Sequence, residues 1–191
     1  MNQKFSDSYI KAFVNSIQAG YLTVDQLDSD KAYDTFKKSY EDATGQAWSK
    51  EKFISRSGGW RFYGTQDGYI TVREQASGML KLTGVAGKPF GIMAGAKALM
   101  KESVPVWGMV SKDIADLAIK LGFKPADPQL VKQYIFKIPS SVFGGAKVKD
   151  VNPDGGVVFE YADIGVVTKY LVGNDQYFSL LQSQGQGNAI Q

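Results

Sequence analysis

Apolar side chains recur at helical spacing through the first 57 residues. Residues 9–17 form the first such run, which Ser6 opens as an N-cap and Gly20 ends. Residues 32–40 form the second, with Asp and Lys on the opposite face, and Ser49 opens a short third helical turn. We therefore predict a helical N-terminal segment. Its apolar positions are Tyr9, Ile10, Phe13, Val14, Ile17, Ala32, Tyr33, Phe36, Tyr40, Trp48 and Phe53.

Short runs of β-forming residues replace this pattern at residue 60. They cover 60–65, 69–75 and 79–85, and the dipeptides Asp67-Gly68 and Ser77-Gly78 separate them as strong turn signals. The three runs predict an antiparallel meander. Its aromatic residues suit either the wall of a substrate site or the core and rim of the sheet, and we favour the core. They are Trp60, Phe62, Tyr63 and Tyr69.

One strand between two helices is predicted next. A loop over 86–90 leads into a helix over 91–102, and a buried strand follows over 104–110. Ser111 then caps the clearest helix of the chain, which ends at Gly122. A strand, a helix and a second strand at this spacing predict a right-handed crossover, with the two strands parallel or flanking a parallel position. The apolar face of the capped helix consists of Ile114, Leu117, Ala118 and Leu121.

The C-terminal third returns to strands. We predict strands over 133–138, 157–161 and 166–171, and a final turn of helix over 177–181. Residues 182–191 form a polar Gln/Gly/Ser tail with nothing to bury. The predicted organisation is a helical segment over 1–57, an α/β core over 58–181 and a flexible tail over 182–191.

The absence of cysteine and histidine excludes several kinds of site from all 191 residues. Without cysteine there is no disulfide framework, thiolate nucleophile or CxxC zinc site. Without histidine there is no Ser-His-Asp triad and no HExxH metalloprotease site. We predict no metal site, and any chemistry falls to carboxylates, Tyr, Ser, Lys, Arg or backbone groups.

Net charge and hydropathy limit the kinds of partner and the cellular location that we expect for this chain. The net charge is +3 with both signs interspersed, which makes nucleic acid an unlikely partner, and a steep salt dependence of DNA binding would test that alternative. No stretch reaches 18 consecutive apolar residues, and the N-terminus lacks a secretory pattern. The expectation is a soluble protein of the cytoplasm, or of a host cytoplasm or virion if a phage encodes it.

The order of predicted elements resembles that of the GNAT acetyltransferase superfamily over about residues 60–138. The best local match is 106–123, which is similar to the family's fifth strand and fourth helix and ends in Leu121-Gly122-Phe123. The resemblance implies an α+β fold with a mixed, twisted β-sheet flanked by helices. It also implies acetyl transfer from acetyl-CoA to an amine of a small molecule or a protein.

The resemblance implies a place for the coenzyme. In the family, pantetheine pairs with exposed backbone of the fourth strand, and a Gly-rich loop presents amides to the pyrophosphate. Gly91 is the first glycine of the family's loop signature, whereas Met93 stands where the signature has a small residue, and a bulky residue at 91 is expected to abolish binding without unfolding. An ordinary strand-to-helix connection explains the same glycines, and a helix cap explains Ser111. The implied coenzyme residues are Leu82, Thr83, Gly84, Val85, Gly87, Lys88, Gly91 and Ser111.

The resemblance also implies an acid and a base. Ala118 and Ser111 stand where many family members have a Tyr and an Asn that face the thioester. Tyr134, on the predicted strand 133–138, is the substitute acid, and Glu74, the carboxylate within the meander, is the candidate general base. A second interpretation is a non-catalytic GNAT-like protein that keeps the fold for partners in an assembly, such as a phage virion component.

Overall fold

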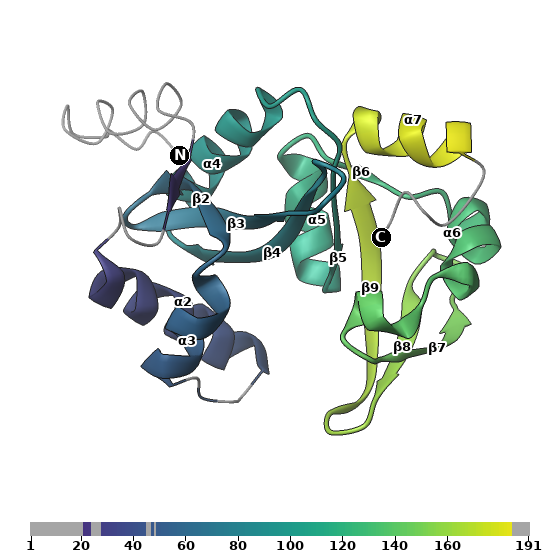
Figure 1. Cartoon of the computed structure of the whole chain (residues 1–191), viewed down its shortest axis with the longest axis horizontal. Coiled ribbons are helices and arrows are strands. Elements are labelled where there is room, and N and C mark those ends of the chain that lie inside the picture. Colours follow the sequence, from purple (N-terminus) through teal and green to yellow (C-terminus); the bar gives the residue numbers. More distant parts are fainter. Residues whose placement is uncertain (1–20, 24–27, 45–46, 48, 185–191) are drawn as a thin grey trace. The chain divides into compact units, whose positions relative to one another are not determined.

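The computed structural model describes residues 21–23, 28–44, 47 and 49–184 (Figure 1). These residues belong to two compact units, each described separately below. The first unit contains the chain up to Glu74 together with Leu82–Glu102, and the second contains Gln75–Lys81 together with the chain from Ser103 onward. The predicted helix over 9–17 and the predicted position of Trp48 lie outside the described residues.

The predicted meander forms the sheet of the first unit. Its strands lie in the order β1 (Leu22–Thr23), β2 (Trp60–Thr65), β3 (Gly68–Glu74) and β4 (Leu80–Gly87). β2 pairs antiparallel with both β1 and β3, and the two-residue turn at Gln66-Asp67 joins β2 to β3. The predicted strands are confirmed with small shifts at their ends. The two-residue β1 was not predicted, because it is too short to carry a period.

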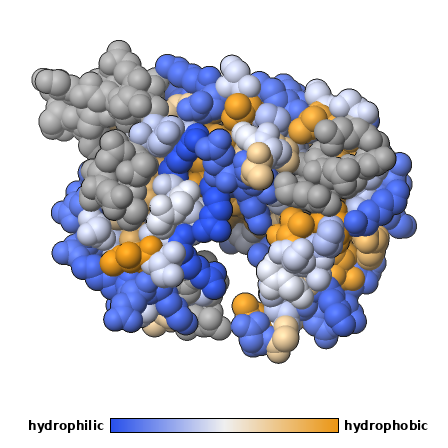
Figure 2. Space-filling view, in the orientation of Figure 1, coloured by the Kyte–Doolittle hydropathy of each residue, from blue (hydrophilic) through white to orange (hydrophobic). Residues whose placement is uncertain are grey.

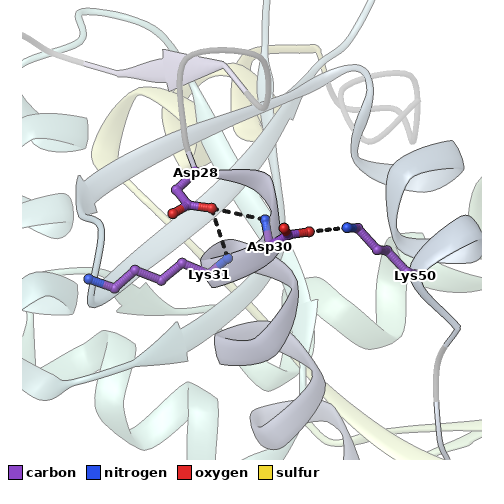
Figure 3. Close-up of polar contacts among 4 residues, drawn as sticks. All are labelled: Asp28, Asp30, Lys31 and Lys50. Atoms are coloured by element: carbon purple, nitrogen blue, oxygen red, sulfur yellow. Dashed lines mark hydrogen bonds and ion pairs between the residues drawn. The ribbon is translucent and has the colours of Figure 1, made fainter.

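Three helices flank this sheet: α2 (Ser29–Thr44), α3 (Lys50–Ser57) and α4 (Pro89–Met100). The carboxylate of Asp28 accepts hydrogen bonds from the amides of Asp30 and Lys31, both 3.2 Å, at the start of α2 (Figure 3). An ion pair between Asp30 and Lys50 then joins α2 to α3. Ser49 caps α3 by accepting from the amide of Lys52, as predicted.

The meander's aromatic residues lie in the core. Trp60, Phe62, Tyr63 and Tyr69 are all buried, so the prediction that they are core residues is confirmed. Phe36 of α2 and Phe53 of α3 pack against this sheet, with the ring centroid of Phe36 5.5 Å from that of Phe53 and 5.7 Å from that of Trp60. An amphipathic helix pair therefore closes one face of the sheet with aromatic side chains.

α4 packs on β2 and β3 through glycine. A Cβ at Gly95 would lie 1.8 Å from the carbonyl oxygen of Tyr63, and a Cβ at Gly91 would lie 2.3 Å from that of Gly68. Both distances are far below van der Waals contact, so the helix backbone rests directly on the strands. Only glycine allows this approach.

The second unit contains the other strands. The first two residues of β4 pair parallel with β5, as Leu80↔Val106 and Lys81↔Trp107, which confirms the predicted parallel relation. β5, β9, β8 and β7 then follow in that order as antiparallel neighbours, and β6 pairs with β9. Their bounds are β5 Val106–Val110, β6 Lys124–Pro125, β7 Lys147–Val151, β8 Val157–Tyr161 and β9 Gly165–Gly173.

The helices of the second unit are α5 (Lys112–Lys120), α6 (Pro128–Tyr134) and α7 (Asp175–Gln184). Ser111 caps α5 as predicted, because its hydroxyl accepts from the amide of Ile114 at 3.4 Å. α7 is longer than predicted and includes residues 182–184 of the expected tail. Helices flank mixed sheets in this way throughout the described chain, so the predicted α+β class is confirmed.

The strand predicted over 133–138 is wrong. Its first residues complete α6, and Ile135–Lys137 continue as a 3-10 turn, η2. Asp127 caps the helix by accepting from the amides of Gln129 and Leu130, and Pro128 supplies the fixed φ that suits a first helical position. The apolar residues here are spaced for a helix, because the buried ones are Val131, Tyr134, Ile135 and Ile138.

Tyr177 anchors α7 in the core of the second unit, and its hydroxyl group makes no hydrogen bond to the residues that the structure describes. Its ring stacks on Trp107 with centroids 5.9 Å apart, and its phenol oxygen is buried without a hydrogen-bond partner among the described residues. Burial also raises the pKa of this phenol.

Tyr177→Phe should therefore stabilise the protein by about 1 kcal/mol, because it removes a buried hydroxyl that loses hydration and gains no bond. Urea unfolding measures the change. Tyr69→Phe is the matched control, since the Tyr69 phenol is also buried but donates to the carbonyl of Ala32 at 2.9 Å, and its loss should destabilise. A Tyr177→Phe protein less stable than the parent would contradict the argument.

Candidate functional site

β4 has one edge that loses its strand partner partway along. β3 pairs with one side of β4, whereas the pairing with β5 ends at Lys81. From Leu82 to Val85 no strand of the described chain pairs with that second edge, and these four residues are half-buried. They are the strand residues that sequence analysis assigned to the coenzyme, so the structure places a free stretch of backbone at the predicted position.

Some polar groups of β4 already form hydrogen bonds within the first unit. The hydroxyl of Thr83 donates to that of Thr71 at 2.9 Å, and the Thr71 hydroxyl donates to the carbonyl of Gly84 at 3.3 Å. A Cβ at Gly84 would lie 3.1 Å from the Thr71 oxygen and 3.5 Å from the Phe36 ring. Thr83 and Gly84 therefore contribute their backbone, and not their side-chain positions, to any ligand.

The connection from β4 to α4 is shorter than predicted, because β4 runs to Gly87 and α4 starts at Pro89. The amide of Gly87 donates to the Ser39 hydroxyl at 3.4 Å, and that of Lys88 donates to the carbonyl of Asp67 at 2.8 Å. Both amides are thus engaged within the unit. The Lys88 side chain is exposed at the helix N-terminus and makes no capping bond.

Gly91 supports the fold. Any side chain at this position meets the carbonyl of Gly68 and the Thr65 hydroxyl, 2.3 and 2.6 Å from the added Cβ. The expectation that a bulky residue at 91 would abolish binding without unfolding is therefore wrong, because it would first force α4 off the sheet. Met93, the predicted obstruction, is 44% exposed.

Glu74 lies at the end of β3. Its carboxylate forms an ion pair with the guanidinium of Arg61 on β2, and its side chain is 54% exposed. The carboxylate is therefore already engaged by Arg61 within the same sheet.

Ser111 and Tyr134 belong to the second unit, whereas Leu82–Val85 belong to the first. Ser111 uses its hydroxyl to cap α5. Tyr134 lies on α6 and is buried, with the Lys137 ammonium 5.6 Å from its ring centroid. Ala118, where the resemblance implies an acid, is buried on α5. The structure brings the strand and loop candidates together in the first unit, with Glu74 on the same sheet.

Sequence reasoning missed Asp67 as a neighbour of the candidate loop. Lys31 binds its carboxylate at 2.8 Å, and this hydrogen bond holds the pKa of the carboxyl below its usual range. Its carbonyl also fixes Lys88. The Asp67-Gly68 signal predicted a turn, but nothing in the local pattern showed that this turn would contact residues twenty positions later.

Two further properties belong to residues 21–23, 28–44, 47 and 49–184. Every helix there is too short or too polar to cross a membrane. These residues also contain no group of three or more Asp or Glu side chains placed to hold a metal ion.

Comparisons of the chain with family models, curated proteins and solved structures found no match. Function is therefore argued from the geometry.

Proposed function

We propose that the chain is an acetyltransferase-like protein of the GNAT type, which binds acetyl-CoA along β4 and transfers the acetyl group to an amine. The observation that carries the proposal is the unpaired edge at Leu82–Val85, beyond two parallel residue pairs with β5. Backbone N–H and C=O groups on such an edge match the amides of a pantetheine arm. The exposed Lys88 ammonium, at the start of α4, adds a positive charge for a phosphate.

The chemistry assigned to this site is acyl transfer. The amine nitrogen attacks the thioester carbon, the carbon–sulfur bond breaks, and the amine proton leaves to a base while the thiolate takes a proton from an acid. Glu74, on the same sheet as β4, is the proposed base, and Tyr134 of the second unit stays a prediction from the sequence for the acid. Because the guanidinium of Arg61 already pairs with the Glu74 carboxylate, we expect a slow reaction.

A second candidate is a non-catalytic GNAT-like protein that serves an assembly. The observation that favours it is the engagement of both loop amides, Gly87 with Ser39 and Lys88 with Asp67, which leaves fewer donors for a pyrophosphate. Ala118, which has no proton to donate, favours it too.

Calorimetric titration with acetyl-CoA separates the two candidates. Under the first, acetyl-CoA binds with a micromolar dissociation constant, and adenosine diphosphate binds more weakly because it lacks the pantetheine arm. Lys88→Glu should weaken the affinity roughly tenfold by reversing one charge near a phosphate. Lys101→Glu is the matched control, since Lys101 is exposed at the opposite end of α4 and should leave the affinity unchanged.

Each outcome decides between the candidates. No heat at millimolar acetyl-CoA would overturn the coenzyme proposal and leave the assembly role. Binding without acetylation of a panel of primary amines would keep the coenzyme proposal and remove the enzymatic part. Equal losses from Lys88→Glu and Lys101→Glu would contradict the placement at the N-terminus of α4.

A further inference from the structure

The three most exposed large apolar side chains of the described residues all belong to the second unit. They are Val166, Ile164 and Phe136, with 67%, 57% and 55% of their surface exposed. Ile164 belongs to the connection between β8 and β9, and Val166 is the second residue of β9; residues 162–166 together are called the hairpin tip. Figure 2 shows hydrophobic residues at the end of this hairpin, which projects at the bottom of Figure 1. Exposed apolar groups gathered in this way are typical of an interaction surface.

A second feature of the same unit is a hollow lined by residues within 135–148. It has a volume of 270 Å³ and lies between η2, η3 (Ser140–Phe143) and the start of β7, and we call it the edge pocket. Its walls are mostly apolar, and Lys147 stands at its rim as the first residue of β7. Its lining residues include Phe136, Ile138, Phe143, Lys147 and Val148.

The strand register fixes the tip and the pocket at the same end of three strands. Lys147 is directly opposite Glu160, and Glu160 is directly opposite Val166. Residues directly opposite in an antiparallel sheet project on the same face. Lys147 and Val166 therefore project on one face, whereas Val148, which is opposite Phe159 and also lines the pocket, projects on the other.

The two features carry opposite charges. The tip contains Asp163, between Ala162 and Ile164, and the pocket has Lys147 at its rim. Glu160 already forms an ion pair with Lys149, at 3.1 Å. Neither Asp163 nor Lys147 has an ion-pair partner within the described part of the chain. A tip with an apolar side chain and an adjacent carboxylate thus matches a pocket with apolar walls and an ammonium at its rim.

We propose that the hairpin tip of one copy docks in the edge pocket of a second copy, with Ile164 in the pocket and Asp163 against Lys147. Because tip and pocket share one end of the same strands, the two copies exchange them reciprocally about a two-fold axis and form a closed dimer. Lys147 and Lys149 on β7, an edge strand with a bulge at Val148/Asp150, also discourage direct pairing of two β7 edges. Two small contacts predict a weak, reversible dimer.

Sedimentation equilibrium of the full chain tests the dimer over micromolar to millimolar concentrations. The expected result is a reversible monomer–dimer equilibrium that weakens as salt is raised. Ile164→Asp should raise the dissociation constant roughly tenfold or more by placing a charge in an apolar pocket. Ile54→Asp is the matched control, because Ile54 of α3 is 48% exposed and lies in the first unit.

A charge exchange tests the specific contact. Asp163→Lys and Lys147→Asp should each weaken self-association, because each homodimer then opposes like charges twice. A mixture of the two variants should restore it. In the heterodimer, the lysine introduced at one tip faces the aspartate introduced at the partner's pocket rim, and the second contact keeps the original pair of Asp163 and Lys147. Circular dichroism confirms that each variant is folded.

Three results would overturn the proposal. The parent chain could remain monomeric at every concentration, Ile54→Asp could weaken the dimer as much as Ile164→Asp does, or the mixed variants could associate no better than each alone. None of these readouts depends on acetyl-CoA, so failure here leaves the proposed function untouched.

Discussion

Gly95→Ala is expected to destabilise the first unit by about 3 kcal/mol or more. Alanine normally stabilises a helix interior relative to glycine by about 1 kcal/mol, so the sign of the effect is itself informative. Here the added Cβ would lie 1.8 Å from the carbonyl oxygen of Tyr63 and 2.7 Å from its carbonyl carbon. Both are backbone atoms of β2, which cannot rotate away as a side chain would. The helix must lift from the sheet to make room.

Urea unfolding monitored by circular dichroism measures this loss. Gly58→Ala is the matched control: Gly58 has φ −58°, and an added Cβ would come no closer than 3.7 Å to the carbonyl of Ile54. Its free energy of unfolding should change by only about 0.5 kcal/mol. A Gly95→Ala protein as stable as the parent would show that α4 does not rest on β2 as described.

Asn174→Ala is expected to cost the second unit about 3 kcal/mol, because one side chain satisfies three backbone groups. Its carbonyl oxygen accepts from the amides of Val106 and Tyr177, both at 3.0 Å. Its amide nitrogen donates to the carbonyl of Val104 at 2.8 Å. Alanine leaves all three unpaired, at the start of β5 and at the first turn of α7.

Ser111→Ala supplies the comparison, since Ser111 caps α5 with a single bond and its loss should cost about 1 kcal/mol. Asn174→Asp keeps both acceptor bonds but sets a carboxylate oxygen against the Val104 carbonyl, so its stability should fall between those of the parent and Asn174→Ala. Thermal and urea unfolding rank the four proteins. Equal costs for Asn174→Ala and Ser111→Ala would mean that only the cap at α7 matters.

The sequence predicted correctly the helix starts that depend on contacts between residues close together in the chain. Ser49 and Ser111 cap the helices that they were expected to cap, because a hydroxyl before a helix bonds to an amide three residues away. The misassigned segment 133–138 fails for the opposite reason. Tyr134, Ile135 and Phe136 favour strands individually, but the cap at Asp127 and the helical spacing of the buried positions outweigh that preference.

The end of the pairing between β4 and β5 at Lys81 agrees with the strand that the resemblance implied to splay there, whereas the assignment of Leu82–Val85 to a coenzyme stays a prediction. The partners of the neighbouring loop could not be foreseen, because Ser39 and Asp67 come from distant parts of the chain. The role of Gly91 could not be predicted either. A glycine that lets a ligand approach and a glycine that lets a helix pack on a sheet look alike in a sequence.

The assignment of Gln75–Lys81 to the second unit has a consequence for synthesis on the ribosome. Every residue of the first unit precedes Ser103, so that unit can close while the rest of the chain is still being made. Residues 75–81 emerge early but belong with partners that emerge later: Gln75 accepts from the Trp107 indole, and Leu80 pairs with Val106. Residues 75–81 therefore remain without these partners, between two segments of the first unit, which can already have folded, until β5 leaves the exit tunnel.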